Sequence, residues 1–300
     1  MNTSAQTQRR TSPTATAGAR ERLLAGLPVT QQVQQPAGVS TPVLDGGEGP
    51  PVVLLHGPGG NAAHWMQLIP DLVQTHRVIA PDLPGQGASE LNAAAPDADR
   101  VLAWLGELIE RNCSAPPALV GAALGGAIAA RFAGEYSGRL DRLVLVDSLG
   151  LCPFQPAPAF GSALHAFLAQ PDDASHDHLW EYCVHDLDVV RRRLGERWPD
   201  FKAYNVDRAQ TPSVQAALAA LMQQFGISEI PAADLARIAV PTALIWGRHD
   251  LATPLSVAEA ASARYGWALH VIDDAADDPA IEQPEATVRA LRRALHAAAP

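Results

Sequence analysis

The feature that most constrains the fold of this chain is a series of short apolar runs, each ending in a tight turn and separated from the next run by a helical pattern. Residues 51–56 form one such run, and the Gly-Pro-Gly-Gly turn of residues 57–60 follows it directly. An apolar run without polar alternation indicates a strand that is buried on both faces of a sheet. Strands that alternate with helices are typical of a mostly parallel sheet flanked by helices. We therefore predict the α/β class.

The remaining elements can be placed along the chain from the same signals. A hairpin is predicted over residues 30–35 and 39–44, because Pro-Ala-Gly separates the two runs. Further strands are expected at residues 76–80, 118–120, 143–147, 242–246 and 268–272. Helices are expected from Asn61, which fits an N-cap, and at residues 97–111, 125–133 and 282–297.

The strand signal disappears between residues 149 and 231, where helical patterns, aromatic side chains and clustered His and Asp residues occur instead. We interpret residues 151–231 as a helical cap inserted into a core formed by residues 29–150 and 232–300. Residues 1–28 are predicted to be a disordered tail, because they are rich in Ser, Thr, Ala and Gln and lack the apolar region of a secretory signal. A transit presequence would also lack acidic residues, but no amphipathic pattern supports it.

Charge and cysteine content limit the classes of partner. The chain has 22 basic and 32 acidic side chains, a formal net charge of −10, so nucleic acid and membrane surfaces are poor partners. No apolar run is long enough to span a bilayer. The three cysteines show no Cys-x-x-Cys spacing, which argues against a disulfide framework and a cysteine zinc site. We expect a cytoplasmic protein with a small-molecule ligand or substrate, no cofactor and no metal, and we leave a homodimer open.

Five turn motifs follow strand ends in a fixed order. They are His56-Gly57-Pro58-Gly59-Gly60, the Asp-Leu-Pro-Gly-Gln-Gly segment from Asp82, Gly121-Ala122-Ala123-Leu124-Gly125-Gly126, Trp246-Gly247-Arg248-His249-Asp250, and Ile281-Glu282-Gln283-Pro284-Glu285. Together they resemble the α/β-hydrolase family of cap-bearing esterases, epoxide hydrolases, dehalogenases and C–C bond hydrolases. The resemblance spans about residues 38 to 297. It implies a mostly parallel sheet, an inserted cap and a catalytic triad of nucleophile, acid and histidine.

The triad that this resemblance implies is incomplete here. The family places its nucleophile at the centre of Gly-x-Ser-x-Gly on a strained strand-to-helix turn, and in this chain that position is Ala123. The acid matches Asp250. The histidine position is Asp277, because Ala276-Asp277 stands where the family has Gly-His before the Pro and Glu landmarks. Serine-ester chemistry is therefore not expected.

The oxyanion hole also departs from the family pattern. The resemblance places its donors in the turn of Gly57, Pro58 and Gly59 and at the N–H of Leu124. Pro58 occupies the usual donor position after His-Gly and has no N–H. Gly59 could donate instead if the turn is shifted by one residue.

Other polar residues of these motifs have simpler structural interpretations. We expect His56 to brace its loop and Asp82 to cap its turn, and we expect His249 to pack within a loop. The cap residues His176, His178 and His185 could line the cleft or bind metal, but scattered His and Asp residues more often form a solvated helix face.

Two carboxylates, Asp250 and Asp277, are the stronger candidates for catalytic residues. Side by side they would raise each other's proton affinity and could act as general acid and base or hold a hard cation. An equal alternative is that Asp277 is a solvated residue in a site that has lost its activity. A working pair of carboxylates would make the chain an enzyme of lyase, cyclase or hydration type. An inactive site would make it a non-catalytic small-molecule-binding pseudoenzyme.

A dinucleotide-binding oxidoreductase is a third and weaker alternative. Residues 57–62 fit Gly-x-Gly-x-x-Ala between a strand and a helix, and Asp82 lies at the spacing of a ribose-binding carboxylate. This alternative leaves the other strand-end motifs unexplained, and it places a rigid proline inside the phosphate turn.

Overall fold

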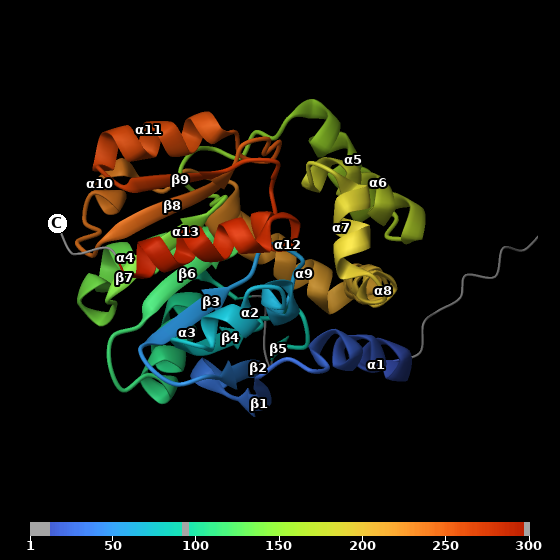
Figure 1. Cartoon of the computed structure of the whole chain (residues 1–300), viewed down its shortest axis with the longest axis horizontal. Coiled ribbons are helices and arrows are strands. Elements are labelled where there is room, and N and C mark those ends of the chain that lie inside the picture. Colours follow the sequence, from blue (N-terminus) through green and yellow to red (C-terminus); the bar gives the residue numbers. More distant parts are fainter. Residues whose placement is uncertain (1–12, 92–95, 297–300) are drawn as a thin grey trace, which may run out of the picture.

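A computed structural model describes residues 13–91 and 96–296. Its centre is a twisted sheet (Figure 1). The strands are β1 (Thr30–Gln34), β2 (Val39–Gly46), β3 (Pro51–Leu55), β4 (Arg77–Pro81), β5 (Glu90–Leu91), β6 (Ala118–Ala122), β7 (Arg142–Val146), β8 (Thr242–Gly247) and β9 (Ala268–Ile272). Every strand expected from the sequence is present, within a few residues of its predicted bounds.

The strand order across the sheet is β1-β2-β4-β3-β6-β7-β8-β9, and β5 pairs with β2 at one side. Strand β2 runs antiparallel to β1 and β4, whereas the strands from β4 to β9 are mutually parallel. The carboxyl ends of the parallel strands therefore lie along one edge of the sheet. This arrangement confirms the predicted fold class.

Helices cover both faces of the sheet. The core helices are α2 (Ile69–Leu72), α3 (Ala98–Asn112), α4 (Leu124–Tyr136), α10 (Ala232–Leu235), α11 (Leu255–Tyr265), α12 (Pro279–Glu282) and α13 (Pro284–His296), with 3₁₀ turns η1 (Pro36–Gly38), η2 (Ala62–Trp65) and η3 (Ser137–Arg139). Helices α3, α4 and α11 bury apolar side chains against one face, and α2 and α13 do so against the other. The alternating residues of each strand thus serve two separate cores.

Two predicted helices are interrupted. Asn61 does cap a turn, since its side chain accepts the Ala63 N–H at 2.9 Å, but that turn is the short η2, and α2 starts only at Ile69. The final helix is divided into α12 and α13, with Pro284 as the first residue of α13. Proline is tolerated there because the first helical residue needs no N–H donor.

The cap helices lie between β7 and β8 and occupy one end of the molecule (Figure 1). They are α5 (Pro158–Ala169), α6 (Asp173–Cys183), α7 (Leu187–Leu194), α8 (Arg197–Gln210) and α9 (Pro212–Leu221), followed by the π turn η4 (Met222–Gly226). Trp180, Trp198 and Phe201 form an aromatic centre among α6, α7 and α8. Among the residues of the two described ranges, none of the helices has the length and apolarity needed to cross a bilayer.

The predicted disordered tail is wrong for its described part. Residues 13–24 form helix α1 (Pro13–Leu24), which lies against the cap helix α8 (Figure 1). Ala19 and Leu23 are buried in the aromatic centre of the cap. The prediction failed because helix formation here depends on packing against residues far along the chain. Residues 1–12 lie outside the described residues.

Helix α1 carries two arginines that bind different parts of the molecule. Arg20 is buried and forms an ion pair at 3.0 Å with the fully buried Asp82, which follows β4 in the core. Arg22 is exposed and pairs at 2.6 Å with Asp200 of α8 in the cap. Arg20 also lies over the Tyr204 ring of α8 at 5.8 Å, so it contacts both core and cap, whereas the ion pair of Arg22 reaches the cap alone.

These two pairs should differ strongly in their contribution to stability. Removal of one member of a buried pair leaves an uncompensated charge, so Arg20→Ala should lower the free energy of unfolding by about 3 kcal/mol. The exposed pair of Arg22 is screened by solvent, so Arg22→Ala should lower the free energy of unfolding far less than Arg20→Ala does. Urea denaturation of the two variants measures the difference. Equal losses would contradict the assigned role of Arg20.

Candidate active site

The turn between β6 and α4 has the geometry of a nucleophile elbow. Ala123, at its apex, has φ 43° and ψ −109°, a conformation that L-residues rarely adopt. Its N–H donates to the Val146 carbonyl at 2.9 Å, and its carbonyl accepts the N–H groups of Leu149 and Ala127, both at 3.1 Å. The turn is thereby fixed to β7 on one side and to α4 on the other.

Two glycines permit this turn. A Cβ at Gly121 would lie 2.3 Å from the Gly125 carbonyl oxygen, and a Cβ at Gly125 would lie 2.5 Å from the Leu55 carbonyl oxygen. Any side chain at either position would therefore push α4 away from β3 or β6. The steric requirements of the elbow are met, but the side chain at its apex is a methyl group.

The turn after β3 faces the Ala123 side chain. A Cβ at Gly57 would lie 3.5 Å from the Ala123 Cβ, so the two turns are in contact. Pro58 follows and offers no N–H. Gly59 has φ 66° and lies below Leu218 of the cap helix α9, whose Cδ2 would be 3.9 Å from a Cβ there. Leu124 is the first residue of α4, and such a residue has no intrahelical acceptor for its N–H.

Asp250 lies in the loop after β8, residues 248–254, which we call the acid loop. Its Oδ1 accepts the N–H groups of Ala252 at 2.7 Å and Thr253 at 2.9 Å. Its Oδ2 is buried and has no hydrogen-bond partner among the described residues. Burial, followed by repulsion from Asp277, raises the pKa of the Asp250 carboxyl well above its ordinary value.

Asp277 lies in the loop between β9 and α12. Its N–H donates to the Cys183 carbonyl at 3.0 Å, a contact that joins this loop to the end of cap helix α6. Its side chain is half-buried. Burial raises the pKa of Asp277 to about 7, so this group exchanges a proton near neutral pH.

Three further carboxyl groups of the region were not singled out from the sequence. Asp147 follows β7, and its Oδ1 accepts the Gly247 N–H at 2.8 Å, while its Oδ2 has no partner among the described residues. Glu282 accepts the N–H groups of Ala276 at 2.7 Å and His185 at 2.6 Å. Asp278 is next to Asp277. The position of Asp147, a carboxylate at the end of an otherwise apolar predicted strand, was the signal that could have identified it.

These carboxyls form one electrostatic group. Burial is the largest cause of a raised pKa for Asp147, Asp278 and Glu282, and the charges of neighbouring carboxyls add to it. The pKa of Glu282 is raised to about 7. Several of these groups therefore hold protons at pH values where an exposed carboxyl is ionised.

Cys183 and His56 are the nucleophile and base types nearest these loops, and neither is placed for acyl-transfer chemistry. Cys183 is near Asp277, and burial together with that carboxylate raises the pKa of its thiol well above the ordinary value, which suppresses the nucleophilic thiolate. His56 accepts the Leu83 N–H at Nε2 over 2.9 Å, and its Nδ1 lies 2.8 Å from the Gly57 carbonyl oxygen. Both ring nitrogens brace the loop, as the sequence predicted.

Asp82 has the turn-capping role expected from its motif. Its carboxylate accepts the N–H groups of Ala62 and Ala88, both at 2.8 Å, and pairs with Arg20. Because all these contacts are internal and the side chain is fully buried, the carboxylate cannot bind a ribose hydroxyl. The dinucleotide-binding alternative is therefore wrong.

The histidines of the cap differ in environment. His176 is fully buried, and it stacks on Trp180 with a ring distance of 5.7 Å, so the prediction of a solvated face is wrong for it. Burial lowers the pKa of His176 to about 4. His178 and His185 are exposed. His185 stacks on His249 at 4.3 Å, which links the cap to the acid loop.

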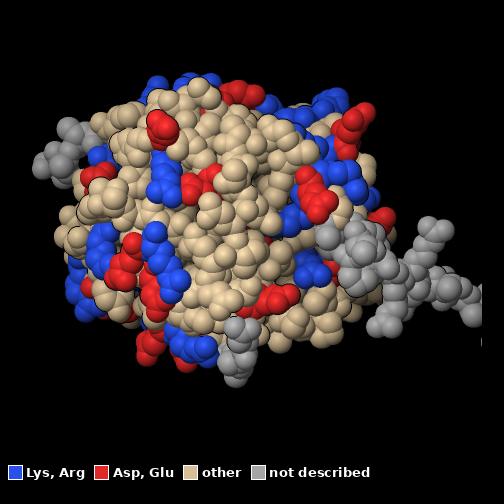
Figure 2. All heavy atoms as spheres, turned by 90° about the horizontal axis from the view of Figure 1, so that it is seen from below, with Lys and Arg blue, Asp and Glu red and all other residues tan. Residues whose placement is uncertain are grey.

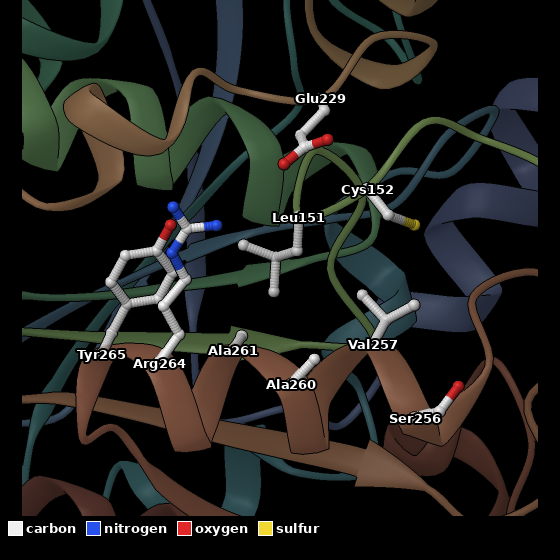
Figure 3. Close-up of a pocket in the computed structure, with 9 residues that line it drawn as sticks. All are labelled: Leu151, Cys152, Glu229, Ser256, Val257, Ala260, Ala261, Arg264 and Tyr265. Carbon is white, nitrogen blue, oxygen red and sulfur yellow. The ribbon is translucent and has the colours of Figure 1, made fainter.

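A surface pocket of about 310 Å³ flanks α11 on the outer side of the acid loop (Figure 3). Glu229 and Arg264 lie on opposite sides of it, over the small side chains of Ala260 and Ala261. Ala123, Asp250 and Asp277 do not line this pocket. The face shown in Figure 2 carries basic and acidic side chains interspersed around a largely uncharged centre.

Comparison with known proteins agrees with this architecture. The model of the alpha/beta hydrolase family matches residues 52–290. The chain belongs to the α/β-hydrolase family. The matched range contains the elbow, the acid loop and the cap.

Several of the similar proteins are named as hydrolases or esterases. The chain is 30% identical to a pimeloyl-[acyl-carrier protein] methyl ester esterase of Aeromonas hydrophila over 80% of its length and 92% of the esterase. It is also 30% identical to a 2-hydroxymuconate semialdehyde hydrolase of Pseudomonas sp. strain CF600, over 73% of this chain and 77% of that enzyme. A solved 2-hydroxy-6-oxo-6-phenylhexa-2,4-dienoate hydrolase of Rhodococcus sp. strain RHA1 superposes with a TM-score of 0.77 at 26% identity, covering 90% of this chain and 99% of that one.

The backbone strain at Ala123 can be measured by substitution with glycine. Ala123→Gly loses a buried methyl group but relieves a conformation that costs about 1–3 kcal/mol. Ala130→Gly, inside α4, loses a similar methyl and adds a helix penalty of about 1 kcal/mol. Chemical denaturation should find Ala123→Gly the more stable variant by at least about 1 kcal/mol. The reverse order would show that Ala123 is not strained.

The raised pKa of Asp277 predicts a pH-dependent stability. Between its ordinary value of about 4 and its folded value of about 7, the folded state holds a proton that the unfolded state has released. The free energy of unfolding therefore falls as pH rises through this window. Asp277→Asn removes this effect and should gain stability over wild type by on the order of 1 kcal/mol between pH 4.5 and pH 8.

The matched control for this measurement is Asp99→Asn, at an exposed carboxylate in α3. Its difference from wild type should change little with pH. A difference between Asp277→Asn and wild type that is equally flat would show that Asp277 titrates as an ordinary solvated carboxylate.

Proposed function

We propose that this chain is an enzyme that acts on a small organic substrate without a serine ester intermediate, with Asp277 and Asp250 as the proton-transfer groups. The reaction class is a lyase, cyclase or hydration reaction. We further propose a cytoplasmic location, which the negative charge and the lack of paired cysteines support.

One observation carries this proposal. Where the family has an imidazole beside its acid, this chain has the carboxyl of Asp277, whose pKa is about 7 and whose charge raises the pKa of Asp250. A group with a pKa near the working pH is present in both protonation states, which general acid–base catalysis requires. The unpartnered Oδ2 of Asp250 provides a hydrogen-bond acceptor, or a donor when protonated, at the same edge of the sheet.

The apex of the elbow defines what this pair would act on. Ala123 offers no atom for covalent attack, so a substrate lying above it would meet only a methyl group, the glycine turn and the start of α4. The similar hydrolases act, by their names, on a methyl ester, a semialdehyde and a dienoate. A carbonyl compound of comparable size is therefore the substrate class we favour.

A second candidate function is non-catalytic binding of the same class of molecule. Pro58 favours it, because this residue removes an oxyanion donor in addition to the loss of the serine and the histidine. Under this alternative the carboxyls transfer no proton and the region around Ala123 only binds the ligand.

A ligand screen followed by turnover assays distinguishes the two candidates. Esters, epoxides and ring-fission dienoates are screened by thermal shift, since a bound ligand stabilises the folded state. Each compound that binds is then incubated with wild type, Asp277→Asn and the exposed control Asp99→Asn. Turnover that falls at least a hundredfold in Asp277→Asn alone would support the enzyme. Binding without turnover by wild type would support the pseudoenzyme.

The loss of serine-ester chemistry has its own test. Wild type should not react with a fluorophosphonate probe at residue 123, and the double variant Ala123→Ser with Asp277→His should react and show weak esterase activity. Stoichiometric labelling of the wild-type elbow would contradict the proposal. A folded double variant without labelling would mean that Pro58 prevents oxyanion binding or that Asp277 is not the histidine position.

A further inference from the structure

Three ligating side chains converge at the boundary between cap and core, outside the group of buried carboxyls. His185 follows the cap helix α6, His249 follows β8 and Asp274 follows β9. One nitrogen or oxygen atom from each lies within 4.8 Å of the other two, and all three side chains are exposed. The rings of His185 and His249 are nearly parallel, with an interplanar angle of 18° and centroids 4.3 Å apart.

The backbone of each of these residues is held by a hydrogen bond that does not use the ligating atoms. The His185 N–H donates to Glu282 Oε2 at 2.6 Å, and the His249 N–H donates to the Ala275 carbonyl at 2.9 Å. The Asp274 carbonyl accepts Gln283 Nε2 at 3.1 Å. The three side chains thus extend from fixed positions and keep their ligating atoms available.

We propose that His185, His249 and Asp274 form a binding site for a divalent transition-metal ion such as Zn²⁺. Two imidazole nitrogens and one carboxylate suit Zn²⁺, whereas Mg²⁺ and Ca²⁺ prefer oxygen ligands alone. Zinc bonds of about 2.1 Å place tetrahedral ligands about 3.4 Å apart. Small rotations of these exposed side chains would bring their ligating atoms to that separation.

The neighbouring carboxylate of Asp273 is already paired with Arg248. Three protein ligands leave the fourth tetrahedral position to water.

The bound ion would join the cap to the core. His185 belongs to the segment between α6 and α7, whereas the other two ligands belong to loops of the sheet. The Asp277 N–H already contacts the Cys183 carbonyl in the same region. Metal binding would therefore stabilise the docked position of the cap beside the acid loop.

The test is calorimetric titration of the untagged full chain with Zn²⁺. Wild type should bind one equivalent, and its melting temperature should rise when Zn²⁺ is added. His185→Ala, His249→Ala and Asp274→Asn should each weaken binding at least tenfold and lose the thermal shift. Because these side chains are exposed, the variants should melt like wild type when no metal is present.

Two control variants separate this site from other binding. His165→Ala removes an exposed histidine of α5. Cys183→Ser removes a thiol close to the carboxyl of Asp277. Both variants should bind Zn²⁺ as wild type does. Mg²⁺ should bind at least a hundredfold more weakly than Zn²⁺. The proposal is overturned if wild type shows no saturable binding, if the three ligand variants bind as wild type does, if Cys183→Ser abolishes binding, or if Mg²⁺ binds equally well.

Discussion

The close contact between Gly121 and Gly125 is the constraint on which the centre of this molecule depends. It lets the chain pass from β6 directly into α4 with Ala123 at a positive φ, and it brings α4 against the end of β3. The Ala123 carbonyl then binds Leu149 at the start of the cap segment, and the Ala123 methyl meets Gly57. The elbow thereby sets the position of the glycine turn on one side and of the route into the cap on the other.

The parallel register explains why so many carboxyls gather at the opposite side of the elbow. Strands β7, β8 and β9 end at the same edge, and each is followed within a few residues by an aspartate. Hydrogen bonds from backbone N–H groups satisfy one oxygen of Asp147 and one of Asp250, which leaves the second oxygen of each without a partner among the described residues. Burial and the charges of neighbouring carboxyls raise the pKa of both groups.

The sequence predicted those parts of the structure that local signals determine. Apolar runs and the turns that follow them predicted every strand except the short β5, whereas the assignment of Ala123, Asp250 and Asp277 to the triad positions stays a prediction. Helix α1 could not be predicted, because its stability comes from the pairing of Arg20 with Asp82, 62 residues away, and from aromatic side chains of the cap. The proximity of His185 to His249 was also not predictable, since it depends on how the cap docks. His176 was misjudged because its burial depends on how the cap helices pack on one another, with Phe167 of α5 and Trp198 and Phe201 of α8 around its ring.

The strain at Ala123 does not by itself indicate a working enzyme. The glycine contacts fix the course of the backbone, so a conformation that costs about 1–3 kcal/mol persists whatever side chain occupies the apex. A chain that had lost all activity would keep this turn as long as it kept its fold. The half-buried carboxyl of Asp277 is different, because its side chain makes no hydrogen bond or ion pair within the described residues, and an uncharged residue of similar size would avoid the cost of desolvating it. The ionisable group at position 277, and not the elbow, is therefore the feature that argues for retained proton chemistry.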